Sequence, residues 1–242
     1  MENIDEKPVG QIVAENYQTY PVFESYKIDY YNKGKRTLLE VANEYKIDLQ
    51  TLKNEITKQR DNPSEEDEDF NSWVLDALSD YIVKTYHRYA DKQIQVIKPS
   101  LEKACQEYGE RYPALPEIKK LFDAAAGQIA VHQKKEELIL FPFIRKMADA
   151  EKNNKAFVRP PATKSVGNPV DMLTHEHYQQ SELFQKIAEL SHDYTSPKGV
   201  DGTFKDSLSL LKEFEINLHK HLHLENNILF PKALKLEKEL TA

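Results

Sequence analysis

An eleven-residue pattern occurs twice in this chain and constrains its fold more than any other feature. The copies at 132–142 and 221–231 both read H-x-x-x-E-x-x-I-L-F-P. A histidine precedes each copy by nearly the same distance, since His87 lies 45 residues before His132 and His177 lies 44 before His221. A repeat of this kind indicates two similar helix pairs packed together, as in a helical bundle.

Helix is the state that the composition favours. Only 7 of the 242 residues are glycine, and good helix formers such as Leu, Glu and Lys are plentiful. Pro116 and Pro169 suit the first turn of a helix, and the second follows the capping residue Asn168. The pattern predicts an all-α antiparallel four-helix bundle over 70–242, with long helices at about 70–109, 116–150, 168–193 and 202–239.

The first quarter of the chain has a different pattern. Short helical stretches are expected at about 8–17, 19–27, 37–45 and 48–59, so residues 1–62 are predicted to form a small helical N-terminal domain. The acidic run at 61–69 reads as a solvated linker to the bundle.

Polar residues interrupt the apolar stripe of each long helix. Positions three or four apart share a helix face, and the stripe must face the core for the helix to gain tertiary stability. In the second long helix the predicted stripe contains Ile129, His132, Glu136, Ile139 and Phe143. The four stripes together place the following polar residues in the core: His87, His132, Glu136, His177, His221 and Glu225.

These six residues form a candidate metal site. A buried carboxylate is costly unless it is paired or bound to a metal, and imidazoles with carboxylates suit iron. A single core histidine is more often a satisfied packing residue, and one His-x-x-x-Glu pair is common on exposed helix faces. The repeated joint pattern favours metal over both alternatives.

The number and type of ligands distinguish between kinds of metal site. A single zinc needs only three or four protein ligands, and ferritin-like bundles use more glutamates with a Glu-x-x-His spacing. Four histidines and two glutamates instead predict two non-haem iron ions. Two octahedral ions would keep open positions for an oxo or hydroxo bridge and a small ligand such as O2 or NO.

The other histidines and the cysteine carry weaker signals. His219 and His223 project away from the stripe of His221, so we expect solvent exposure, with a stray surface metal as the alternative. His175 and His192 have no supporting pattern, and Cys105 is expected to be a packing residue.

The bulk properties limit the partners and the compartment. A net charge of −7 argues against nucleic acid as a partner. No apolar stretch approaches the length that crosses a bilayer, and the polar first ten residues lack the apolar core of a signal peptide. With a single cysteine, no internal disulfide is possible, and these features together predict a cytoplasmic protein without a membrane partner.

Over nearly its whole length the chain resembles the iron–sulfur cluster repair di-iron proteins, which have a hemerythrin-like bundle. The resemblance rests on Tyr86-His87, Glu176-His177 and the two repeat copies, of which the Glu225-Asn-Asn-Ile-Leu-Phe-Pro run is the most specific. It implies that the six residues named above bind two irons, with Glu136 and Glu225 bridging. It also implies that Glu176 is a carboxylate of the outer shell or of a channel.

The N-terminal segment resembles the small helical domain of the same family, with one departure. Val9-Gly10-Gln11-Ile12-Val13 and the run from Phe23 to Tyr30 fit its opening. The family has two adjacent cysteines and two glycines after the Asp-aromatic pair, whereas this chain has Tyr31-Asn32-Lys33-Gly34. Tyrosine and asparagine supply neither thiol redox chemistry nor soft metal ligation, so any role that needs the dithiol is in doubt.

Three functions are compatible with these features. The resemblance implies a di-iron protein of the nitrosative and oxidative stress response that helps to restore iron–sulfur proteins, either by supplying iron or by reacting with NO or oxygen species. The second is a hemerythrin-like protein that binds or senses O2 or NO without repair, and the third is a metal-free helical interaction protein.

Overall fold

A computed structural model describes residues 3–61, 69–159, 165–200 and 202–241. The described residues are largely helical and contain no β-strand; the one bridge joins Pro8 to Thr37. The predicted linker lies mostly within 62–68, which is outside the described residues. None of the described helices is both long and apolar enough to cross a membrane.

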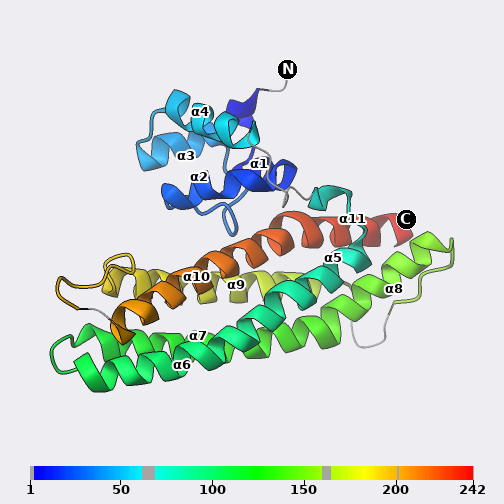
Figure 1. Ribbon diagram of the computed structural model, residues 1–242. Coiled ribbons are helices and arrows are strands. Elements are labelled where there is room, and N and C mark those ends of the chain that lie inside the picture. Colours follow the sequence, from blue (N-terminus) through cyan, green and yellow to red (C-terminus); the bar gives the residue numbers. More distant parts are fainter. Residues whose placement is uncertain (1–2, 62–68, 160–164, 201, 242) are drawn as a thin grey trace.

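The N-terminal segment forms a cluster of short helices beside the longer ones (Figure 1). Thr37 and Glu40 form a reciprocal capping box at the start of one helix, and the Asp48 side chain caps the next by accepting from the Thr51 amide. Residues such as Phe23, Leu38 and Ile56 pack into a core of their own. The helices are α1 (Val9–Glu15), α2 (Tyr20–Ser25), α3 (Leu38–Tyr45) and α4 (Leu49–Arg60).

Four long helices form the bundle, which confirms the predicted all-α fold (Figure 1). The central helices are α6 (Arg88–Tyr108), α7 (Ala114–Lys135), α9 (Gly167–Leu190) and α10 (Thr203–Leu224). α6 packs on α7 and α10, and α7 packs on α9. Three of the long helices are extended by α5 (Leu75–Ile82), α8 (Phe141–Lys152) and α11 (Phe230–Thr241).

Each extension joins its helix through one π-helical turn. These turns are Val83–His87, Glu136–Leu140 and Glu225–Leu229. A π turn inserts one residue into the helix, so the positions that follow rotate relative to the α-helical pattern. The prediction that Ile139 lies on the core stripe is wrong, because Ile139 is 46% exposed while Leu140 is fully buried; the equivalent Ile228, in the same kind of turn of the second copy, is buried.

The bundle core is divided into two apolar clusters. One lies mainly on α5, α8 and α11 and includes Phe141 and Phe230, and the other lies mainly on α6, α7, α9 and α10 and includes Phe122 and Phe184. The predicted polar residues occupy the layer between these clusters. An apolar wall on either side keeps this layer away from water.

Candidate metal centre

The six predicted residues come together in this buried layer. His87 ends one π turn, while Glu136 and Glu225 begin the other two. The three remaining residues, His132, His177 and His221, lie in α7, α9 and α10. None of the six is more than 4% exposed. Each repeat copy thus places its glutamate at a π turn, a feature that often marks functional sites.

Two overlapping groups of four side chains each have one ligand atom per residue within 4.8 Å of the others. One group contains His87 and His221, the other contains His132 and His177, and both glutamates belong to both groups. Imidazole nitrogens surround each carboxylate. Glu136 lies 3.3 Å from the Nε2 atoms of both His87 and His132, and Glu225 lies 3.2 Å from His177 and 3.1 Å from His221.

The histidines and glutamates of the layer shift one another's pKa values. Burial alone lowers the pKa of His132, but the charges of Glu136 and Glu225 outweigh it and raise that pKa to about 9. The same balance raises the pKa of His87. Burial raises the pKa of Glu136, yet His132 and His87 hold it well below its usual range. Without a metal, protons on the imidazoles must therefore balance the buried carboxylates.

The polar atoms that face the centre of the layer have few partners among the described residues. Nε2 of His87 and of His221 is buried without a hydrogen bond, and so are both carboxylate oxygens of Glu136 and Glu225. The Nε2 atoms of His132 and His177 face one another at 3.0 Å. Buried polar groups are normally satisfied, so converging acceptors of this kind fit a bound cation.

Three of the histidines have a hydrogen-bond partner on the nitrogen that points away from the centre. The Nδ1 atoms of His87 and His132 lie 3.0 Å from Glu137 and 2.9 Å from Glu176. Nδ1 of His177 lies 2.9 Å from Oδ1 of Asn226. Such partners fix the tautomer and ring orientation of a ligating histidine.

Glu176, which the resemblance implied to be an outer carboxylate, thus contacts His132 rather than its neighbour His177. The roles of Glu137 and Asn226 were missed from the sequence. Each directly follows the glutamate of its repeat copy, so their equivalent positions in the repeat were a usable signal.

The predicted exposure of His219 and His223 is wrong. His219 is 7% exposed and His223 is fully buried. His219 stacks on Tyr31 with ring centres 3.9 Å apart and lies 2.9 Å from Glu24 through Nδ1. The N-terminal helices cover this face of α10, and sequence periodicity within one helix gives no information about such a cover. His175 and His192 are exposed, and Cys105 packs against the second bundle cluster.

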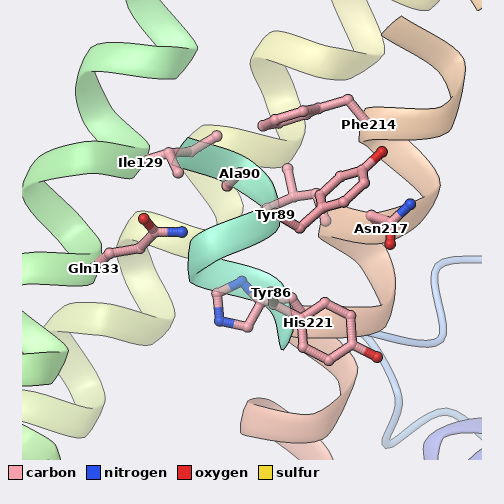
Figure 2. Close-up of a pocket in the computed structure, with 9 residues that line it drawn as sticks. Tyr86, Tyr89, Ala90, Ile129, Gln133, Phe214, Asn217 and His221 are labelled. Carbon is pink, nitrogen blue, oxygen red and sulfur yellow. The ribbon is translucent and has the colours of Figure 1, made fainter. Parts of the chain in front are cut away.

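A small pocket adjoins the layer on the His221 side (Figure 2). Its volume of about 10 Å³ is enough for roughly one water-sized molecule. Its lining includes the polar residues Tyr86, Tyr89, Gln133, Asn217 and His221, and Nε2 of Gln133 has no hydrogen-bond partner within the described part of the chain. The remaining lining is mostly apolar, including Ile129 and Phe214.

Comparisons with known proteins agree with this geometry. Residues 78–233 match the model of the hemerythrin HHE cation binding domain, and residues 5–60 match a domain of unknown function (DUF542). The iron–sulfur cluster repair protein YtfE of Yersinia pseudotuberculosis serotype IB (strain PB1/+) is 29% identical over 230 residues, covering 95% of this chain and 97% of that protein. YtfE of Yersinia pestis (strain Pestoides F) is 28% identical over 217 residues, covering 89% and 91%. The first match spans well over half of the chain, so this protein belongs to the hemerythrin HHE cation-binding family.

Proposed function

We propose that this protein holds two non-haem iron ions in the polar layer and uses them to help restore damaged iron–sulfur proteins. One observation carries the metal half of the proposal: six buried side chains, from all four long helices, aim nitrogen and oxygen atoms at a common centre, and those of His87, Glu136, His221 and Glu225 have no hydrogen-bond partner among the described residues. The family match supports cation binding by these residues.

The arrangement of the carboxylates favours two ions over one. The two oxygens of Glu136 approach different imidazoles, Oε2 that of His87 and Oε1 that of His132. Glu225 does the same, with Oε2 towards His177 and Oε1 towards His221. Each glutamate therefore presents one oxygen to each histidine pair, as a bridging carboxylate does. An additional oxo or hydroxo bridge fits an iron pair of this kind.

The protein's own residues have three roles in this account. The imidazoles bind through Nε2, and the partners at Nδ1 of His87, His132 and His177 hold those rings in place. The two glutamates supply negative charge that balances the ions. Phe141 stacks on His87 and Phe230 on His177, and these rings help to exclude water. Bound iron would supply one-electron redox chemistry and open positions for O2, NO or related species.

The repair role is supported by the two relatives, which are named as iron–sulfur cluster repair proteins and match nearly the full chain. We propose iron–sulfur proteins as its partners. We also propose the cytoplasm as its location, because a single cysteine allows no internal disulfide of the kind that is common in oxidising compartments.

The test is recovery of an iron–sulfur hydratase inactivated by NO, after addition of the iron-loaded protein. We expect recovery with the wild type and with His175→Ala, a matched control because His175 is exposed on the same helix as His177. His132→Ala should give no recovery. Equal recovery with His132→Ala, or none with the wild type, would contradict the repair role.

A second candidate is reversible binding or sensing of O2 or NO without repair. Two observations favour it: Tyr31 and Asn32 stand where the family pattern has its cysteine pair, and a pocket of about 10 Å³ adjoins His221. A visible spectrum that changes reversibly with the gas, together with no recovery of the damaged hydratase, would select this function.

A further inference from the structure

The two halves of the metal layer have different supports on their outer side. His87 and His132, which contact Glu136, are backed by Glu137 and Glu176. These two carboxylates are held in turn by lysines of α7, with Lys134 on Glu137 and Lys135 on Glu176. The first half of the layer is thus supported entirely from within the bundle, by charged pairs.

The second half is supported from the N-terminal segment. His177 contacts Asn226, which occupies the position equivalent to Glu137 in the repeat. His221 stacks on Tyr86, with ring centres 5.6 Å apart and planes 9° apart, and the Tyr86 hydroxyl lies 3.0 Å from that of Tyr17. A neutral amide and an aromatic ring thus replace the two charged pairs, and the residues that hold them come from the N-terminal segment.

The contact to His177 is the more specific of the two. The Asn226 side-chain amide donates to the Tyr31 carbonyl at 3.2 Å and to Oδ1 of Asn32 at 3.1 Å. An amide has two N–H donors and one carbonyl oxygen, so acceptors on both donors leave the oxygen pointing towards His177. The loop at Tyr31 and Asn32 therefore determines which way the Asn226 amide faces.

This orientation determines the tautomer of His177. Oδ1 of Asn226 only accepts, so the imidazole must donate from Nδ1 across the 2.9 Å contact. In a neutral imidazole the Nε2 lone pair is then free, and Nε2 points at Glu225 and at His132. If the Asn226 amide rotated by half a turn, a donor would face Nδ1 and the opposite tautomer would be favoured.

We propose that the N-terminal domain is a structural part of the metal centre, with Asn32 as a positioning residue that acts through Asn226 on His177. The inference rests on the proposed metal centre and adds a role for the loop that lacks the cysteine pair. Docking of this domain keeps His177 ready to bind, so changes in the loop alter the centre without changing any ligand.

The test compares variants at one position of the loop with a matched control. Asn32→Ala removes the acceptor for Asn226, whereas Asn32→Asp keeps an acceptor oxygen. Tyr178→Phe is the control, because the Tyr178 hydroxyl donates to the Asn32 backbone carbonyl and not to the side chain of Asn226. The measurements are the rate of iron(II) loss to a chelator and the Mössbauer spectrum of the loaded, full-length protein.

We expect Asn32→Ala to lose iron about 10-fold faster than the wild type, at the low end of the range for loss of an outer-shell partner. One of the two iron signals should shift, since His177 belongs to only one of the two groups. The rates of iron loss from Asn32→Asp and Tyr178→Phe should stay within about twofold of the wild-type rate, well below the 10-fold increase expected for Asn32→Ala.

Two results would overturn the inference. If Asn32→Ala and Tyr178→Phe lose iron at the same rate and give the same spectrum, the loop does not position His177. If the wild type binds no iron, the proposed centre itself fails and the inference fails with it. Nitrogen NMR of the imidazoles in the metal-free proteins separates misfolding from positioning, because a folded Asn32→Ala should still lose the preference of His177 for a proton on Nδ1.

Discussion

Raising the pH should destabilise the metal-free protein more than the iron-loaded one. The perturbed group is His132, whose pKa is raised to about 9 by Glu136 and Glu225 despite the opposing effect of burial. In the unfolded chain its pKa returns to about 6.5. Between these values the folded state holds a proton that the unfolded state has lost, so the stability that His132 contributes is fully present below about pH 6.5 and is lost as the pH rises through 9.

The size of the effect follows from the difference between the two pKa values. A shift from 6.5 to about 9 corresponds to roughly 3 kcal/mol at about 1.4 kcal/mol per pH unit. His87 adds to the loss in the same direction, because its pKa is also raised. For a chain of this length, 3 kcal/mol corresponds to a decrease in Tm of roughly 6–12 °C.

Iron replaces the proton on the ligating imidazole, so the loaded protein should lack this loss. The stabilisation that iron provides should therefore grow by about 3 kcal/mol between pH 6.5 and 9. Apparent affinity for iron(II) should rise about tenfold per pH unit for each proton displaced.

The assay is thermal and urea unfolding of both forms across this pH range, with calorimetry in buffers of different ionisation enthalpy to count the released protons. His219 is a useful internal reference. Glu24 raises its pKa against the effect of burial, and it lies outside the two metal groups, so its contribution remains in both forms. Parallel pH profiles of the metal-free and loaded proteins, with no proton release at pH 7, would refute this account of the polar layer.

Three further predictions concern the parts around the centre. Phe122→Ala removes a fully buried ring from the second bundle cluster, so it should cost about 3–5 kcal/mol in urea unfolding while iron per chain stays unchanged. Gly34→Ala should loosen the docked N-terminal loop, because a Cβ at Gly34 would lie 2.6 Å from the Tyr30 carbonyl; a lower Tm and faster iron loss than the wild type are expected. Burial lowers the pKa of His223 to about 3, so the folded protein loses stability as the pH falls below about 6.5, where only the unfolded chain takes up the proton. His223→Phe should reduce that loss by about 2 kcal/mol between pH 6.5 and 5, as measured by urea unfolding of the metal-free protein.

The sequence was sufficient to predict that these six residues gather in one buried layer, because each of them interrupts an apolar stripe with helical spacing and the repeat links them. The α-helical rule failed at Ile139, which is exposed although its counterpart Ile228 in the second copy is buried. Both residues lie in π turns, so the difference comes from what packs over each of them, which periodicity does not describe.

Contacts between the N-terminal segment and the bundle also could not be predicted from the sequence. His219 and His223 are covered by Tyr31 and Tyr30, which are almost 200 residues away in the sequence. The contact of Asn32 with Asn226 joins residues that are equally distant in the sequence. Helix periodicity describes which residues share a face of one helix, but it does not say what covers that face.

The central claim is that the layer between the two apolar clusters holds two iron ions. Iron analysis with Mössbauer spectroscopy of the protein from iron-rich medium tests it most directly. The account predicts about two irons per chain with a spin-coupled spectrum, reduced to less than about one in Glu225→Ala, where the carboxylate shared by both groups is lost. Less than about one iron per chain in the wild type, or unchanged iron in Glu225→Ala, would contradict it.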